Sequence, residues 1–259
     1  MKMRSIAVAN EKGGVGKTVT VINLAAALTL ENKKVLVVDM DPQANATRGL
    51  GIESWDGKPS VYDLIQPPGQ VNLSEAIAKT AWEGLDLIPG DVDLAGAEVE
   101  LVDVEGRENR LKDALTGLSA DSYDFVLLDT PPSLSLLTVN VFAYAREVLI
   151  PCQTHPYAFG ALAELHETVT AVREEINPEI SILGIVPTFY DGRTRVSQQM
   201  LSQLQADERY RHLLFKTVVR SNTTIAESAA VGKPVVFYRK GSFGAIDYSD
   251  LAVELLQKA

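Results

Sequence analysis

The stretch SIAVANEKGGVGKTVT, residues 5–20, decides the fold class of this chain. Its first five residues form a short apolar run that is typical of a buried strand, and its last four open a helical pattern. The loop between them carries Gly13, Gly14 and Gly16. Glycines at these positions allow backbone N–H groups to curl around an anion at the start of the helix, where the helix dipole also favours negative charge. We therefore predict that this loop binds phosphate.

The loop ends in Gly16, Lys17 and Thr18, as a P-loop does, although Glu11 stands where the general G-x-x-x-x-G-K-[ST] pattern has its first glycine. Lys17 would reach the β- and γ-phosphates of a nucleotide, and the Thr18 hydroxyl would ligate Mg²⁺. The alternative is a glycine-rich turn that binds no nucleotide, which the position between a strand and a helix disfavours. The predicted nucleotide-binding residues of the loop are Lys12, Gly13, Gly14, Val15, Gly16, Lys17, Thr18 and Val19.

Apolar runs and helical patterns alternate along the rest of the chain, which predicts βαβ units. The expected fold is α/β: a doubly wound, mostly parallel sheet with helices on both faces, of the P-loop NTPase type. We expect residues 1–259 to form a single domain, with a surface excursion and one short helix in the irregular region 51–72. The strand-like runs lie at residues 5–9, 33–41, 85–90, 123–132, 146–152 and 180–189, and the helical patterns at 17–32, 135–145 and 161–176.

Composition and charge narrow the function further. The net charge of −10 argues against a protein coated in nucleic acid, although a local basic patch remains open. No run reaches the roughly 18 uncharged apolar residues of a membrane span, and the first residues lack a signal-peptide pattern, so we expect a cytoplasmic protein. The single cysteine, Cys152, excludes an internal disulfide, and His155, His166 and His212 lack metal-ligand spacing.

Acidic residues follow two of the other predicted strands. Asp39 and Asp41 are separated by one residue, so alternation along an extended strand would turn both carboxylates the same way. A solvated turn is the alternative for this pair. Asp129 closes the apolar run FVLLD, in the position of an aspartate that holds Mg²⁺ directly or through water, and Pro131 and Pro132 stiffen the loop that follows. Together these groups place phosphate, metal and water ligands on one edge of one sheet.

Three motifs carry a resemblance to a known family: KGGVGKT, DMDPQAN and DTPP. They resemble those of the ParA/Soj partition ATPases, within the deviant Walker A proteins that include MinD and the nitrogenase iron protein. The similarity continues through LAGAEVEL, GRENRLKDAL, DGRT and GKPVVFY to the last helix. It therefore covers essentially the whole length.

The resemblance implies roles for individual residues. Lys12 would cross a dimer interface to the nucleotide of the partner subunit, where a second cation stabilises phosphate charge, unless it is only a solvated surface lysine. ATP would then hold a homodimer together. Lys12, Lys17 and Asp41 would be the catalytic residues, with Asp41 positioning the attacking water. The expected metal ligands are Thr18, Asp39 and Asp129, and the candidate walls of the base pocket are Pro187 and Thr188.

Other branches of the superfamily fit less well. The C-terminal sequence YSDLAVELLQKA has few cations, unlike the basic amphipathic helix with which MinD-type proteins bind membranes, so we expect no membrane contact. Iron proteins need two cysteines per subunit, and only Cys152 exists. A metabolic or cofactor-assembly enzyme that uses ATP stays open as the alternative, although no second catalytic constellation is visible.

A ParA-type protein would segregate a plasmid, a chromosome or another cargo with a ParB-like partner that stimulates hydrolysis, and would bind the nucleoid when ATP-bound. By resemblance, Arg193 of DGRT matches one arginine that contacts duplex DNA without sequence preference. Thr224 stands at another such position, with Arg220 nearby as a substitute. The candidate DNA-binding cations are Arg193, Arg195, Arg220, Arg239 and Lys240.

Overall fold

A computed structural model describes residues 3–53, 55, 57–67, 71–156 and 158–258 of the chain. The predicted excursion over residues 51–72 lies partly outside the described residues, and its described part contains one short helix, as expected.

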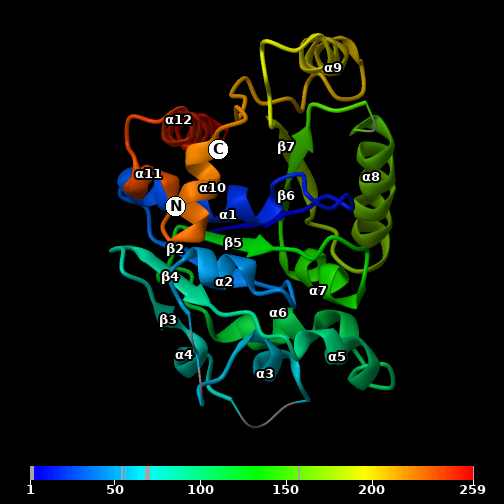
Figure 1. Cartoon of the computed structure of the whole chain (residues 1–259). Coiled ribbons are helices and arrows are strands. Elements are labelled where there is room, and N and C mark those ends of the chain that lie inside the picture. Colours follow the sequence, from blue (N-terminus) through cyan, green and yellow to red (C-terminus); the bar gives the residue numbers. More distant parts are fainter. Residues whose placement is uncertain (1–2, 54, 56, 68–70, 157, 259) are drawn as a thin grey trace.

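Seven strands form one sheet in the order β3-β4-β2-β5-β1-β6-β7 (Figure 1). Only the β3–β4 pair is antiparallel among the described strands, so the prediction of a doubly wound, mostly parallel sheet is confirmed. The neighbours of β1 are β5 and β6, and the chain passes from β1 to the β2 side before it returns. The loop after β1 therefore lies where the connections diverge, which is where open α/β sheets bind ligands. The strands are β1 (Arg4–Val8), β2 (Val35–Asp39), β3 (Ala78–Lys79), β4 (Leu85–Ile88), β5 (Phe125–Asp129), β6 (Glu147–Gln153) and β7 (Ser181–Thr188).

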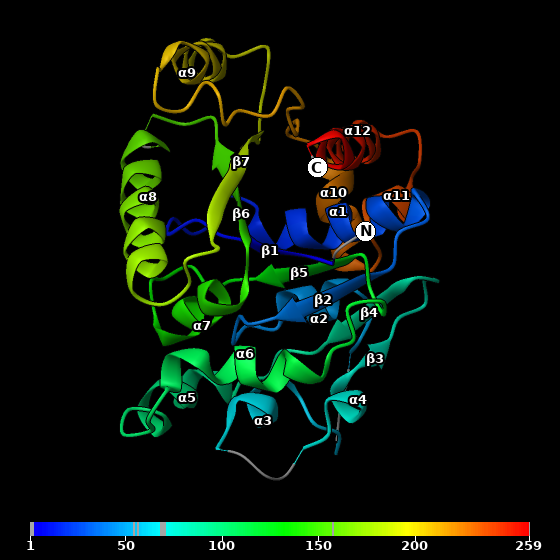
Figure 2. The same cartoon turned by 180° about the vertical axis from the view of Figure 1, so that it is seen from behind.

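Helices connect the strands and cover both faces of the sheet (Figures 1 and 2). The α-helices are α1 (Lys17–Leu30), α2 (Asn45–Gly49), α3 (Val61–Ile65), α4 (Leu73–Ala76), α5 (Leu94–Glu100), α6 (Arg110–Ala114), α7 (Leu136–Tyr144), α8 (Ala158–Glu175), α9 (Arg195–Ala206), α10 (Thr223–Ala230), α11 (Val235–Tyr238) and α12 (Phe243–Gln257). Two 3₁₀ helices, η1 (Arg107–Asn109) and η2 (Leu115–Gly117), flank α6. None of the helices within the described residues is both long and apolar enough to cross a membrane.

The central strands are buried on both faces, which explains their continuous apolar sequences. Along β2, Leu36 and Val38 belong to one hydrophobic core, while Val35 and Val37 belong to the other. The first core is completed mainly by α3 and α5 to α9, and the second by α1, α11 and α12. The sheet is therefore a middle layer that both sets of helices hold in place.

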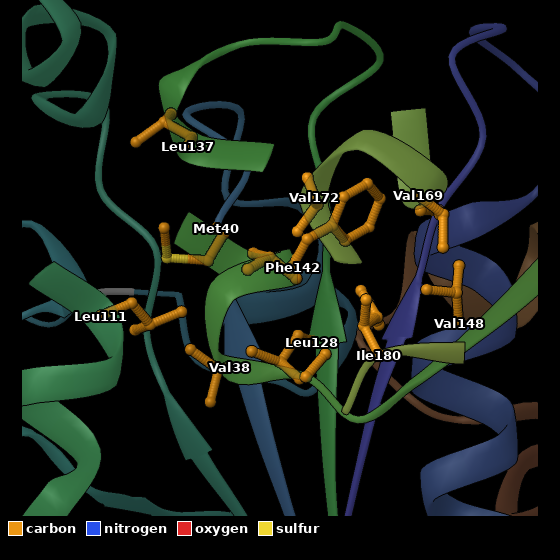
Figure 3. Close-up of a cluster of buried hydrophobic side chains, with 14 of the residues drawn as sticks. Val38, Met40, Leu111, Leu128, Leu137, Phe142, Val148, Val169, Val172 and Ile180 are labelled. Atoms are coloured by element: carbon orange, nitrogen blue, oxygen red, sulfur yellow. The ribbon is translucent and has the colours of Figure 1, made fainter. Parts of the chain in front are cut away.

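Figure 3 shows part of the first core. Val38, Leu128 and Val148, from three different strands, lie beneath Phe142 of α7 and Val169 of α8 (Figure 3). All five side chains are at most 2% exposed. Truncation of such a side chain to alanine typically costs about 2–5 kcal/mol, so this layer contributes strongly to the stability of the sheet.

Candidate active site

The loop between β1 and α1 adopts the glycine-dependent path that the sequence predicts. Gly14 and Gly16 have φ angles of 74° and 93°, in the left-handed region where a side chain is strained. A Cβ atom on Gly16 would lie 3.3 Å from the ring of Phe189. Gly16 caps α1 without a side-chain hydrogen bond, so side chains leave the first N–H groups of the helix available for an anion.

Lys17, the first residue of α1, lies beneath this loop and is only 7% exposed. Its Nζ donates hydrogen bonds to the backbone oxygens of Asn10, at 3.0 Å, and Lys12, at 3.4 Å. Burial lowers the pKa of the Lys17 ammonium, and the nearby charges of Asp129 and Asp41 counteract this. The structure thus brings three of the predicted side chains together.

Asp129 is the last residue of β5 and is completely buried. Neither of its carboxylate oxygens has a hydrogen-bond partner among the described residues. Burial and the neighbouring Asp39 raise the pKa of Asp129 well above its ordinary value. The nearby Thr18 hydroxyl partly offsets that rise, although the two groups make no hydrogen bond of normal distance and angle.

Asp39 ends β2 beside Asp129 and is also fully buried, but its oxygens are occupied. Oδ2 accepts hydrogen bonds from the backbone N–H and the hydroxyl of Thr47, at 2.8 and 2.7 Å. The same hydroxyl accepts a bond of 2.9 Å from the Gly90 N–H. Burial raises the pKa of Asp39 to about 6, against the effect of these hydrogen bonds.

Asp41 reaches the site differently from our expectation. Strand β2 ends at Asp39, so Asp41 lies in the following turn and not on an extended strand. The Asp41 N–H donates to Asp39 Oδ1 at 3.2 Å, and Asp41 Oδ1 accepts from the Gln43 N–H at 2.9 Å. The turn therefore brings Asp41 close to Asp39 and Lys17, as predicted, by a different route.

These residues fit a magnesium nucleotide. Two unpartnered carboxylate oxygens and a nearby hydroxyl are hard oxygen ligands of the kind that Mg²⁺ prefers. Within the described residues, no group of three or more His, Cys, Asp or Glu side chains could hold a metal ion alone. An ion here would thus depend on water and phosphate oxygens, which is usual for Mg²⁺.

Several residues that support the site were missed in the sequence. Thr47 orients Asp39, and Gly90 is required because a Cβ atom there would lie 2.9 Å from Asp39 Cγ. Asn10 accepts the Lys12 N–H at 3.0 Å and donates to the Pro151 carbonyl at 2.8 Å, which ties the loop to β6. In the sequence, the only indication of Thr47, Gly90 and Asn10 was that each is a small or amide residue close to a motif or to the end of a predicted strand.

The predicted base-pocket walls lie at the end of β7. Thr188 is 2% exposed, and its hydroxyl donates to the Val15 carbonyl at 2.8 Å. The Pro187 carbonyl accepts the Val219 N–H at 2.8 Å. The Thr188 side chain therefore supports the phosphate loop from the neighbouring strand, and the contacts to a base stay a prediction.

Lys12 and Cys152 lie near one another at the end of β6. The Lys12 side chain is partly exposed and forms no ion pair or hydrogen bond with a described residue. Cys152 is buried, and burial raises the pKa of its thiol to about 12 despite the Lys12 charge. Cys152 is therefore a buried free thiol near the end of β6.

The five predicted DNA-binding cations differ in how strongly the fold engages them. Arg193 has a side chain that is 91% exposed and pairs with Asp191 of the same turn. Arg220 is instead 37% exposed, since its guanidinium is held by the buried Asp247 and lies over the Phe243 ring. Thr224 is 7% exposed in the first turn of α10. The other three predicted DNA-binding cations, Arg195, Arg239 and Lys240, are exposed.

Comparisons with known proteins agree with this geometry. A family model described as an AAA domain matches residues 3–182, which include the loop and both acidic strand ends. The chain is similar to the sporulation initiation inhibitor protein Soj of Bacillus subtilis, with 42% identity over 250 residues that cover 96% of this chain and 97% of that protein. It is also similar to the chromosome-partitioning ATPase Soj of Thermus thermophilus, with 43% identity and coverage of 99% and 97%.

A solved structure of similar fold carries a different name. The cobyrinic acid a,c-diamide synthase from Mycobacterium smegmatis, with bound ADP and magnesium, has a TM-score of 0.83 and 36% identity, with 98% of this chain and 94% of that chain covered. The solved relative therefore holds the kind of ligand that the present site fits.

Proposed function

Because the chain belongs to the ParA/Soj family of partition ATPases, we propose that it hydrolyses ATP slowly, with Mg²⁺, to time a switch between a dimer and a monomer. The output of such a switch is the position of a cargo, such as a plasmid or a chromosome. A ParB-like protein bound to that cargo stimulates hydrolysis.

One observation carries the nucleotide site: the buried Asp129 carboxylate has no partner, and it lies beside Lys17 under a loop whose N–H groups are available to an anion. An unpartnered carboxylate in the interior is costly, and such groups are retained where a cation or a ligand completes them. Bound Mg²⁺ would neutralise phosphate charge. Residues of this chain, Asp129 first among them, would provide oxygen ligands for that ion.

The proposed roles of the other site residues follow from which of their side-chain atoms have no hydrogen-bond partner among the described residues. Lys17 would hold the terminal phosphates of the nucleotide, and Thr18 and Asp129 would hold Mg²⁺. Asp39 has both oxygens engaged by Thr47 and by the Asp41 N–H, so it would contact the metal only through water. Asp41 Oδ2 has no hydrogen bond to a described residue, which supports a role in positioning the attacking water.

The role of Lys12 is proposed to lie in the partner subunit of an ATP-bound homodimer. Its backbone is fixed by Asn10, while its side chain has no partner of its own in the described chain. A lysine with an anchored backbone and an uncommitted ammonium is suited to reach phosphates across an interface. ADP lacks the γ-phosphate and would not hold two subunits together.

DNA binding is proposed for the ATP-bound dimer, which would thereby associate with the nucleoid. The support is the exposed Arg193 in the DGRT loop, together with the exposed Arg195, Arg239 and Lys240. The backbone of Tyr190 pairs with that of Arg220, so the two predicted arginine positions lie in neighbouring segments. Binding through phosphates alone would be independent of DNA sequence.

The test combines two measurements on the purified chain. We expect ATP and Mg²⁺, but not ADP, to double the mass seen by light scattering. We expect duplex DNA and a ParB-type protein from the same source to raise the rate of phosphate release together. A protein that stays monomeric with ATP in both the wild type and the Asp41→Ala variant would contradict the switch.

A metabolic enzyme that activates a small substrate with ATP is the second candidate, and the similarity to the cobyrinic acid a,c-diamide synthase structure favours it. The same assay separates the two functions. A hydrolysis rate that depends on a small carboxylic-acid acceptor with an amide-nitrogen donor, and ignores DNA and the ParB-type protein, would support the metabolic role.

A further inference from the structure

Glu11 places a negative charge inside the phosphate loop. It stands where the general P-loop pattern has its first glycine, one residue before Lys12. Phosphate groups repel a nearby carboxylate, and this repulsion is strong where little water screens it. A loop that binds a nucleotide with a glutamate at this position therefore has to hold the carboxylate away from the phosphates.

A hydrogen bond from helix α8 holds the Glu11 carboxylate. The Thr168 hydroxyl donates to Glu11 Oε1 at 3.0 Å, although the two residues are 157 positions apart in the sequence. The Thr168 side chain is partly buried. No lysine or arginine of the described chain forms an ion pair with Glu11, so its charge is not neutralised by a neighbouring cation. A hydrogen bond to an ionised acceptor is stronger than one between neutral groups, which suits this contact to a positioning role.

Helix α8 is a rigid support for this hydrogen bond. Leu165, one turn before Thr168, is 1% exposed in the first hydrophobic core. It also borders a hollow of about 10 Å³ together with Asn10, Glu11 and the segment that follows β5. A hollow of this size is too small for anything larger than one water molecule. Both overall views show the dark blue chain between β1 and α1 reaching α8 (Figures 1 and 2). The phosphate loop and α8 are therefore packed closely together.

The backbone on either side of Glu11 is anchored by contacts that do not involve Thr168. Asn10 donates from its side chain to the Pro151 carbonyl at 2.8 Å and accepts the Lys12 N–H at 3.0 Å. The Asn10 carbonyl accepts a hydrogen bond of 3.0 Å from Lys17 Nζ. Loss of the Thr168 hydroxyl would therefore release the Glu11 side chain, which could then change rotamer, and leave the path of the loop in place.

We propose that Thr168 is a positioning residue of the nucleotide site: its hydroxyl holds the Glu11 carboxylate against α8 and so keeps this negative charge off the bound phosphates. Without the hydroxyl, the Glu11 side chain is free to turn toward the phosphates or toward the ammonium of Lys12. The first movement weakens nucleotide binding, and the second engages the lysine that is proposed to reach the partner subunit. The effect on dimerisation rests on the proposed function, whereas the effect on nucleotide affinity does not.

Substitutions on α8 test the role of the hydroxyl. Thr168→Val removes the hydroxyl and keeps a similar shape, whereas Thr168→Ser keeps the hydroxyl. Thr170→Val is the matched control, because the Thr170 hydroxyl donates to the His166 carbonyl of the same helix at 2.8 Å. ATP carries one more negative charge than ADP. We therefore expect Thr168→Val to bind a non-hydrolysable ATP analogue about tenfold more weakly, and ADP with a smaller loss, while Thr168→Ser and Thr170→Val stay close to the wild type. Fluorescence titrations with Mg²⁺ measure both affinities.

Substitution of Glu11 tests the charge itself. Glu11→Gln removes the negative charge and keeps a side-chain oxygen for the Thr168 hydroxyl, so this variant should bind the ATP analogue at least as tightly as the wild type. Combined with Thr168→Val, it should restore the affinity to within about twofold of the wild type, because no carboxylate is left to repel the phosphates. The defect of Thr168→Val alone should shrink as the salt concentration rises, since salt screens charge repulsion. A mere loss of packing would show neither effect.

Two outcomes would overturn the proposal. Equal affinities of Thr168→Val and Thr170→Val for the ATP analogue would show that the hydroxyl has no role in the site. A combined Glu11→Gln and Thr168→Val variant that binds as weakly as Thr168→Val alone would show that the charge of Glu11 is not the cause. Thermal unfolding of each variant separates a local effect from a loss of stability. Light scattering with ATP tests the link to dimerisation: a wild type that binds ATP and stays monomeric would contradict the switch, while the affinities would still decide the role of Thr168.

Discussion

At the residue scale, the end of β2 and the end of β5 bring two buried carboxyl groups side by side, because Asp39 pairs in register with Asp129. Burial raises the pKa of both groups, that of Asp39 from 3.8 to about 6. The folded state therefore binds their protons more tightly than the unfolded state does. By linkage, these groups make the free energy of unfolding fall as pH rises above 3.8, through the window up to about 6 for Asp39.

The substitution Asp129→Asn tests this pH dependence of stability, because it removes the buried carboxyl group. Without nucleotide, we expect the variant to be more stable than the wild type at pH 7 by about 1–3 kcal/mol, and the difference to shrink toward pH 4. Thermal unfolding at several pH values measures it. The same variant should lose Mg²⁺-dependent nucleotide binding. A variant that is less stable than the wild type at pH 7 would show that Asp129 has a partner in the free protein.

Substitution of the two lysines of the phosphate loop should have different effects. Lys17 lies within its own site, so Lys17→Ala should abolish nucleotide binding. The Lys12 side chain forms no hydrogen bond or ion pair with a described residue of its own chain, so Lys12→Ala should bind ADP nearly normally but fail to dimerise with ATP. Fluorescent ADP titration and light scattering report the two properties. Normal ATP-dependent dimerisation of Lys12→Ala would remove its proposed role in the partner's site.

Asp41 is proposed to act on water and not on phosphate binding. Asp41→Ala should therefore retain ATP affinity and lose at least about tenfold in turnover, since the lost interaction is made mainly in the transition state. The protein should accumulate as an ATP dimer. Single-turnover phosphate release measures the step directly, and release at the native rate would exclude this assignment.

At the element scale, the segment before α10 is anchored to α12 by Arg220. The backbone N–H and Nε of Arg220 donate to the buried Asp247 carboxylate at 2.9 to 3.1 Å, and the guanidinium lies 4.1 Å from the Phe243 ring centre. Asp247→Ala should reduce the free energy of unfolding by about 1–3 kcal/mol, discounted from a fully buried pair because Arg220 is 37% exposed. Chemical denaturation measures it. Asp250→Ala on the exposed face of α12 is the control and should change little.

The sequence predicts well those helices and strands whose own residues show a regular hydrophobic pattern. All six expected strands and three expected helices exist, because long apolar runs and a regular helical period reflect burial on both faces of a sheet. Helix α1 ends two residues earlier than predicted because Asn32 adopts a left-handed conformation, which terminates helices. The antiparallel strand β3 has two residues, too few for any pattern.

Features held by distant contacts were not predictable. Helix α11 has four residues, and its first N–H is accepted by Asn23 Oδ1, far away in the sequence. In the site, the motifs identify Lys17, Asp39 and Asp129. They do not show that Thr47 donates hydrogen bonds to Asp39, whereas the Asp129 oxygens have no hydrogen-bond partner among the described residues. That distinction depends on how two strand ends meet.

At the scale of the whole molecule, the acidic segment around α5 and the loop that carries Arg193 are far apart. The acidic α5 is at one end in both overall views, while α9, which follows Arg193, is at the other (Figures 1 and 2). The net charge of −10 repels a polyanion at long range. Repulsion fades beyond a Debye length of about 8 Å at physiological salt, so a local cationic surface can still bind phosphates.

The ATP-bound dimer should therefore bind duplex DNA of any sequence and lose affinity steeply with salt, whereas the ADP-bound monomer should not bind. Each phosphate contact contributes about 0.9 to the slope of log affinity against log salt, so Arg193→Ala in both subunits should lower that slope by about 1.8. Arg220→Ala should reduce the slope less, because its side chain is only 37% exposed and is held by the buried Asp247, whereas the Arg193 side chain is 91% exposed and its partner Asp191 is near the surface. A gel-shift titration with the Asp41→Ala dimer at several salt concentrations measures both. Absence of binding at low salt, or a slope unchanged when Arg193→Ala and Arg220→Ala are combined, would mean that the surface on which this protein positions its cargo is not DNA.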